Sequence, residues 1–236
     1  MNHLTIFPHK PKESNRAYAY RILHYNIMTM VLPPGTALNE NEAAEQLGTS
    51  RTPVHEALTL LAKDYLVEIR PQSGSFISKI SLRNVREGLF MRSTLEPAIY
   101  RQLAGNIAKE DLNTISANLE HTQQMIPAGK DDFIDPYIKL DDEFHKLAYL
   151  AAGKPILWAS VTNVCSHFQR IRYQEYQVLQ TNLTHVYDEH RQLYEYLLFG
   201  GSAYFDLDSF YEQHLSYFKT YLPKLISAHP DYYTMD

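Results

Sequence analysis

Apolar residues recur at helical spacing near the start of the chain. In the segment SNRAYAYRILHYNIMTMV, residues 14–31, the large apolar positions are Ile22, Leu23, Ile27, Met30 and Val31. Residues three and four positions apart lie on one face of an α-helix, so the segment predicts an amphipathic helix. The sequence PPG at 33–35 ends the helix and predicts a turn.

A short second helix is predicted after this turn. Asn39 is suited to be its N-cap, and Glu42 three residues later completes a capping box. Gly48 marks its end, because glycine readily adopts the left-handed conformation that often follows a helix. Only about three residues then separate this helix from the next.

The third predicted helix begins in GTSRTPVHEALTLLAKDYL, residues 48–66, with Ser50 as its N-cap. Its apolar stripe consists of Val54, Leu58 and Leu61. The opposite face carries Arg51, His55 and Thr59 at intervals of four. A helix N-terminus attracts phosphate, and arginine can bond guanine with two hydrogen bonds. The exposed first turns are therefore suited to contact DNA.

After this helix the period changes from helix to strand. LVEIR and SFISKI predict two short strands joined by PQSG, with Gly74 at the turn. Three helices followed by a two-stranded wing form a winged helix-turn-helix, in which the third helix enters the major groove. A plain three-helix domain with a solvated polar face is the alternative. The candidate DNA contacts are Ser50, Arg51, Thr52, His55, Gln72 and Gly74.

The rest of the chain predicts helices and no strand up to about residue 226. The expected helices span 82–105, 110–126, 131–152, 154–179, 183–199 and 205–226. The predicted fold is therefore mainly α, with a winged helix-turn-helix at 1–80 and an all-α antiparallel bundle at 81–236. Residues 1–80 carry a net charge of +1 and residues 81–236 carry −6, which favours different partners for the two parts.

A carboxylate and three imidazoles are the chemically distinctive groups of the predicted bundle. Asp141 and His145 are four residues apart on one helix face, and His190 and His214 belong to two later helices. This nitrogen and oxygen set suits a divalent Zn, Ni, Fe or Mn ion. Taken singly, each histidine is more often a core or surface residue, and spacing alone leaves the two interpretations about even.

Three further side chains are candidates for binding a small effector. Arg92 and Arg172 can clamp a carboxylate, because guanidinium and carboxylate groups match in geometry, although ordinary salt bridging is the commoner role. His167 is a candidate neighbour of the pocket.

Composition excludes several classes of protein. No apolar run approaches the roughly 20 residues of a membrane helix, and no charged and then apolar leader opens the chain. The single cysteine, Cys165, excludes an internal disulfide and suits the reducing cytoplasm. The chain shows no nucleophile elbow, P-loop or HExxH motif, which weakens an enzymatic interpretation.

The run PPGTALNENEAAEQLGTSRTPVHEALTLLAKDYLVEIRPQSGSFI resembles the DNA-binding head of GntR-family bacterial regulators. The most specific parts of this resemblance are SRTPV, EAL and the wing glycine. His55 stands where that family usually has an arginine that touches DNA.

A second resemblance covers most of residues 85–220. The segments MRSTLEPAIYRQLA, LDDEFHKLAYL, YDEHRQLYEYLL and FYEQHLSYF resemble the FCD ligand-binding domain of the FadR-like subfamily. In many members of that subfamily an aspartate and three histidines bind a divalent metal, which assigns the ligand role to Asp141, His145, His190 and His214. The stretch between His190 and His214 is slightly longer than is usual there.

The resemblance implies a homodimeric transcription regulator, most often a repressor, that reads a palindromic operator in double-stranded DNA. A small carboxylate metabolite bound at the metal would control its DNA affinity. Two alternatives remain at this point. One is a metal-dependent enzyme that uses the Asp and His residues of the bundle, and the other is a regulator whose bundle serves only for dimerisation.

Overall fold

The computed structural model describes residues 2–126, 134–179, 183–202 and 204–235. Chain contacts divide it into two compact units, which are described separately below. The first unit consists of Met1–Arg86, Asn163–Gln174 and Lys224–Asp236, and the second of Glu87–Thr162 and Glu175–Pro223. The first three residues of the helix predicted at 131–152 lie outside the described residues.

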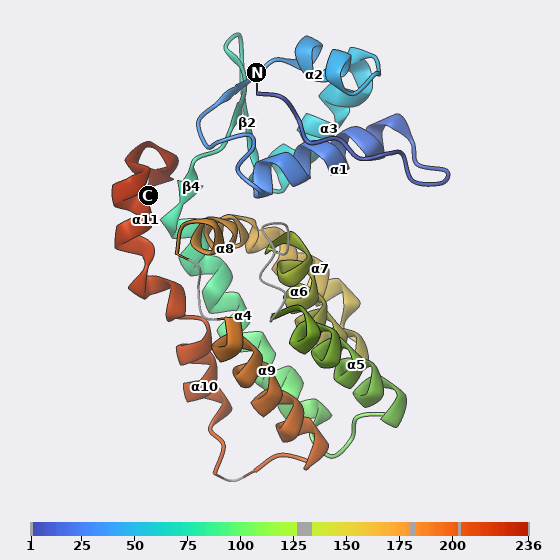
Figure 1. Cartoon of the computed structure of the whole chain (residues 1–236), viewed down its shortest axis with the longest axis vertical. Helices are drawn as coiled ribbons and strands as arrows, with labels where there is room; N and C mark the ends of the chain where they lie inside the picture. The colour runs from blue at the N-terminus through green and yellow to red at the C-terminus, as the bar shows by residue number, and fades with distance from the viewer. Residues whose placement is uncertain (1, 127–133, 180–182, 203, 236) are drawn as a thin grey trace. The chain divides into compact units, whose positions relative to one another are not determined.

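Three helices form the centre of the first unit, as predicted (Figure 1). They are α1 (Asn15–Met28), α2 (Glu40–Gln46) and α3 (Arg51–Lys63). α3 packs against both α1 and α2. It buries Val54, Ala57, Leu58 and Leu61 completely. Removing these apolar side chains from water stabilises the trihelical core, and it leaves the opposite face of α3 exposed.

The ends of α2 and the start of α3 follow the predicted chemistry with one exception. The Asn39 side chain accepts hydrogen bonds from the backbone N–H groups of Asn41 and Glu42. Gly48 has a φ of +62°, in the left-handed region that favours glycine. Ser50 occupies the N-cap position of α3, but its side chain makes no capping hydrogen bond.

The wing has three strands where the sequence predicted two. β2 (Val67–Arg70) and β3 (Gly74–Ile77) pair antiparallel, with Arg70 opposite Gly74 across the turn. β1 (Ala37–Leu38) pairs with the other edge of β3, so the order is β1-β3-β2. A strand of two residues is too short to show an alternating pattern, and for this reason it was missed.

A second, parallel strand pair lies beyond the wing. β4 (Ile80–Ser81) pairs with β5 (Tyr233–Thr234), with Ile80 opposite Tyr233. The sequence did not predict a strand in the C-terminal segment, because its partner is about 150 residues away and leaves no local signal.

The second unit is built from helices (Figure 1). They include α4 (Leu82–Leu103), α5 (Lys109–Met125), α6 (Ile134–Ala151), α7 (Pro155–Val164), α9 (Leu183–Leu198) and α10 (Leu207–His214). α5 packs against α6 and α9. The mainly α fold with an N-terminal winged helix-turn-helix is therefore confirmed.

Two of the predicted helices are interrupted. The stretch 154–179 forms α7 and α8 (Ser166–Leu179), which break at Cys165. The stretch 205–226 forms α10, a 3-10 turn (Tyr217–Thr220) and α11 (Leu222–Ala228). The apolar period continues across both breaks, so the pattern alone could not locate them.

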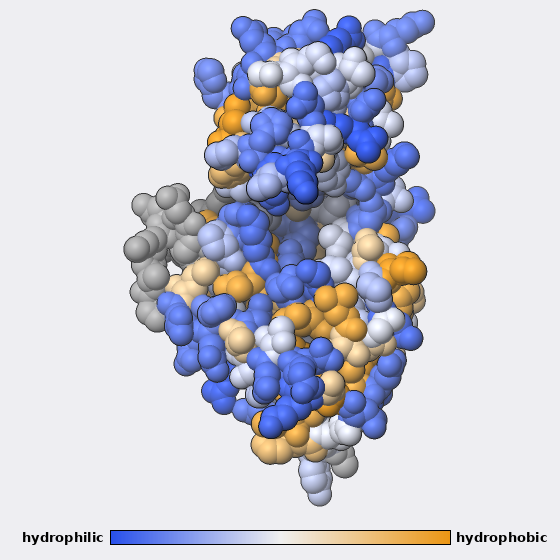
Figure 2. Space-filling view, turned by 90° about the vertical axis from the view of Figure 1, so that its right-hand side faces the viewer, coloured by the Kyte–Doolittle hydropathy of each residue, from blue (hydrophilic) through white to orange (hydrophobic). Residues whose placement is uncertain are grey.

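The face shown in Figure 2 carries hydrophobic patches among hydrophilic side chains. Several large apolar side chains of the second unit are exposed, among them Phe90 at 73%, Ile156 at 80% and Phe199 at 75%. None of the described helices is both long enough and apolar enough to cross a membrane.

Candidate functional site

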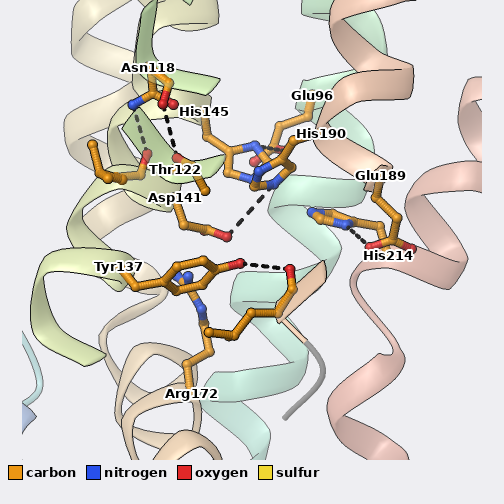
Figure 3. Close-up of polar contacts among 12 residues, drawn as sticks. Glu96, Asn118, Thr122, Tyr137, Asp141, His145, Arg172, Glu189, His190 and His214 are labelled. Atoms are coloured by element: carbon orange, nitrogen blue, oxygen red, sulfur yellow. Dashed lines mark hydrogen bonds and ion pairs between the residues drawn. The ribbon is translucent and has the colours of Figure 1, made fainter. Parts of the chain in front are cut away.

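Three histidines from three helices converge inside the second unit (Figure 3). His145 lies on α6, His190 on α9, and His214 is the last residue of α10. One ring nitrogen from each lies within 4.8 Å of the others. Asp141, one turn before His145 on α6, places Oδ1 3.7 Å from His190 Nε2. The structure thus brings together all four residues that the sequence singled out.

The cluster is buried and held by aromatic packing. His145 and His190 are each 2% exposed, and Asp141 is 5% exposed. The Phe144 ring stacks on His190, with centroids 4.3 Å apart. The Phe210 ring stacks on His214 in the same way, at 5.6 Å. These two stacking contacts orient the imidazoles of His190 and His214.

Two glutamates that the sequence did not single out complete the cluster. Glu189 Oε2 lies 2.8 Å from His214 Nδ1, and Glu96 Oε2 lies 3.1 Å from His145 Nδ1. A carboxylate on one ring nitrogen orients the imidazole and leaves the other nitrogen to bind a metal. Both residues look like ordinary helix-surface acids in the sequence, and only tertiary packing shows that they are buried.

Arg92 and Glu96 form a buried ion pair beside the histidines. Arg92 Nε lies 2.5 Å from Glu96 Oε1, and Arg92 Nη2 lies 3.2 Å from Oε2. Burial opposes ionisation of Glu96, but the charges of Arg92 and His145 outweigh it and hold the pKa of Glu96 well below its ordinary value. Burial in turn lowers the pKa of His145, against the opposing effect of Glu96. Burial therefore favours the neutral imidazole of His145, which is the form that can donate a lone pair.

The residues fit a divalent first-row metal. His145 Nδ1 contacts Glu96, whereas its Nε2 is buried and makes no hydrogen bond in the described structure. Nitrogen ligands at about 2.1 Å from an ion lie roughly 3–4 Å from one another. The observed separations, up to 4.8 Å, need only a small inward movement of the rings. Three imidazoles and a carboxylate are also the donors that Zn, Ni, Fe and Mn accept.

The three effector candidates occupy different surroundings. Arg92 lies next to the cluster and is engaged by Glu96. Arg172 and His167 lie on α8, in the part of that helix that belongs to the first unit. Arg172 Nη1 donates to Gln169 Oε1 at 2.8 Å, and His167 Nδ1 accepts from the Ser81 N–H at 3.0 Å. Their role toward an effector stays a prediction.

The exposed face of α3 is the second candidate site. The side chains of Arg51 and His55 are 67% and 59% exposed. Both contact the carboxylate of Glu40 on α2, which the sequence did not single out. Ser50 and Thr52 are exposed beside them at the start of the helix.

The tip of the wing supplies the remaining DNA candidates. Gln72 and Gly74 are exposed in the β2–β3 turn, with φ of +60° and +98°. A Cβ on Gly74 would meet no atom within 4 Å, so this glycine serves the backbone conformation and not close packing.

Comparison with protein families matches two successive segments of the chain. Residues 15–77 match "Bacterial regulatory proteins, gntR family", and residues 87–200 match the "FCD domain". The HTH-type transcriptional repressor RspR of Escherichia coli (strain K12) is 35% identical over 166 residues, which are 70% of this chain and 72% of that protein. The chain belongs to the GntR family. It is a DNA-binding transcription regulator with an FCD domain.

Other relatives agree with this assignment. A probable D-xylose utilization operon transcriptional repressor of Paenarthrobacter nicotinovorans is 34% identical over 42% of this chain and 43% of its own. The solved structure of E. coli McbR/YncC has the same fold, with a TM-score of 0.71 and 21% identity over 92% of this chain and 99% of that one. The family and these relatives are regulators and not enzymes, so the metal-dependent enzyme is set aside.

Proposed function

We propose that this GntR-family protein is a homodimeric repressor whose operator affinity is controlled by a small carboxylate effector. The effector would bind at a divalent metal held by Asp141, His145, His190 and His214. The observation that carries this proposal is the convergence of three histidines, two of them buried, beside a carboxylate. Two relatives that are named as repressors support repression of transcription and not activation.

A bound metal would supply positive charge and open coordination positions to a carboxylate ligand. The residues of this chain would do the rest. Glu96 and Glu189 orient His145 and His214 through their Nδ1 atoms. Arg92 acts electrostatically on His145 and pairs with Glu96, and it would meet the effector by exchanging part of this pairing.

DNA contacts are proposed for the exposed face of α3 and the tip of the wing. Arg51, Thr52 and His55 would meet base edges and phosphates in the major groove, with Ser50 at the helix N-terminus. Gln72 and Gly74 would contact the backbone beside the groove. Because bacterial DNA lies in the cytoplasm, we expect the protein to act there.

Elemental analysis of the purified protein tests the metal site. Wild-type protein should contain close to one equivalent of a first-row metal per chain, or should gain thermal stability when zinc or nickel is added. His190→Ala should reduce metal content sharply, because it removes a buried ligand. His121→Ala is the matched control, since it removes an exposed imidazole from α5.

A measurement of operator binding distinguishes loss of the metal site from misfolding of the variant. His190→Ala should keep operator affinity in a gel-shift titration, because its change lies in the second unit. Wild-type protein that holds no metal and shows no thermal shift with zinc or nickel would refute the metal site. A metal-free regulator would then be the function that remains.

A further inference from the structure

Glu40 joins the two exposed side chains of the α3 face. It is the first residue of α2, and its side chain is only 15% exposed. Its Oε2 accepts a hydrogen bond from Arg51 Nε at 2.6 Å, and its Oε1 lies 3.0 Å from His55 Nδ1. Each carboxylate oxygen thus has one partner on α3.

These contacts decide which nitrogen of His55 carries the proton. Burial raises the pKa of Glu40, but the hydrogen bonds from His55 and Arg51 outweigh it, so that pKa lies below its ordinary value. An ionised carboxylate can only accept hydrogen bonds, and Nδ1 must therefore be the donor. In a neutral imidazole the other nitrogen, Nε2, then has a free lone pair and acts as an acceptor.

The same carboxylate leaves the far end of Arg51 available. Only Nε of the guanidinium is engaged by Glu40. The two terminal nitrogens can still donate together to O6 and N7 of guanine, which is the commonest specific contact of arginine in the major groove. Holding Nε also reduces the conformational freedom that the long side chain would lose on binding DNA.

We propose that Glu40 determines base preference by presenting Arg51 as a donor for guanine and His55 Nε2 as an acceptor for cytosine or adenine. In the major groove only the amino groups of cytosine N4 and adenine N6 donate hydrogen bonds. An arginine at position 55 would read guanine instead. This inference rests on the proposed DNA contacts of α3.

A purely stabilising role explains the geometry less well. Arg51 and His55 are mostly exposed, and ion pairs on exposed side chains contribute little to folding. Glu40 is the least exposed of the three side chains, so the arrangement orients the exposed partners and does not shield them from solvent. Orientation of two side chains toward an outside ligand is the effect that remains.

Selection of duplexes from a randomised DNA library by the full-length protein tests the inference. It is done at pH 8, where a free imidazole is neutral. Wild-type protein should select cytosine or adenine at one position of each half-site. His55→Arg should change that same position to guanine, and its added cation should steepen the slope of log affinity against log salt by about 0.9.

Glu40→Gln is the decisive variant. Its amide oxygen still accepts from Arg51, but its NH₂ group donates to His55 Nδ1 and moves the imidazole proton to Nε2. His55 then becomes a donor, so the discrimination against guanine and thymine at its position should fall by about tenfold. Glu45→Gln is the control, because it removes the same charge from an exposed position of α2.

Circular dichroism and melting temperature confirm that each variant is folded. The inference is wrong if Glu40→Gln selects the same half-site as wild type, or if the position that changes in His55→Arg is guanine or thymine in wild type. Arg51→Ala and His55→Arg distinguish a failure of the proposed α3 contacts from a failure of the proposed role of Glu40. If neither changes the selected half-site, the proposed α3 contacts fail, whereas a change in both without a change in Glu40→Gln overturns only the role of Glu40.

Discussion

At the scale of single residues, carboxylates with little solvent exposure contact and orient functional side chains at both candidate sites. Glu96 and Glu189 contact histidines of the bundle cluster, and Glu40 contacts the exposed residues of α3. None of the three was recognised as functional from sequence, because an acid on a helix usually belongs to a solvated face. The reactive side chains can be recognised in the sequence, whereas the carboxylates that orient them are recognised only in the tertiary structure.

Arg51 should be essential for specific DNA binding. Arg51→Ala removes the guanidinium that Glu40 holds toward solvent, and it should weaken operator binding by about 1–3 kcal/mol. The fold should be kept, since the side chain is 67% exposed. A gel-shift titration combined with circular dichroism checks this. Unchanged operator affinity in a folded variant would contradict the assignment.

His167 should make the protein less stable in acid. Burial lowers its pKa from 6.5 to about 4, and the charge of Arg170 adds to this shift. Between these pH values only the unfolded state binds the proton, so stability falls as pH falls. The expected loss is about 1.4 kcal/mol per pH unit, or about 3 kcal/mol by pH 4.

Urea unfolding at several pH values between 7 and 4 measures this effect. His167→Gln should lose less stability over the same range than wild type, because glutamine does not titrate there. His121→Gln serves as the control, since His121 is exposed. Parallel pH profiles for wild type and His167→Gln would show that His167 does not carry the effect.

At the scale of elements, local chemistry predicted the head of the protein well. The Asn39 cap, the Gly48 turn and the apolar stripe of α3 all act within a few residues, so their signals are readable in the sequence. β1, β5 and the break at Cys165 were missed, because strand partners and helix breaks there depend on contacts distant in the chain.

The same local rules explain why the metal ligands were only partly predictable. The Asp141 and His145 pair follows from helical spacing, whereas His190 and His214 join it only through the packing of α9 and α10. Residue type together with family resemblance supplied what spacing could not.

The two N-caps of the head should contribute differently to stability. Asn39 accepts two backbone hydrogen bonds, so Asn39→Ala should cost about 1 kcal/mol. Ser50 makes no capping bond, so Ser50→Ala should cost less than about 0.5 kcal/mol. Urea unfolding of both variants gives the comparison. Equal losses would mean that Ser50 caps α3 in solution.

At the scale of the whole molecule, the regulator should form a homodimer. Most soluble oligomers have twofold symmetry, and a palindromic operator matches such symmetry. Exposed Phe90, Ile156 and Phe199 are apolar groups that a subunit contact can cover. Light scattering after size-exclusion chromatography should give about twice the chain mass of 27.4 kDa. A mass of one chain at micromolar concentration would rule the dimer out.

The parallel pair of β4 and β5 has a consequence for biosynthesis. Ile80 leaves the ribosome long before Tyr233, so this pair cannot form until nearly all of the described chain has been translated. α1, α2 and α3 pack against one another, and α3 also packs against β2, so their main contacts are with residues made early in translation. The nascent chain should therefore carry a folded helical head before β4 can pair with β5.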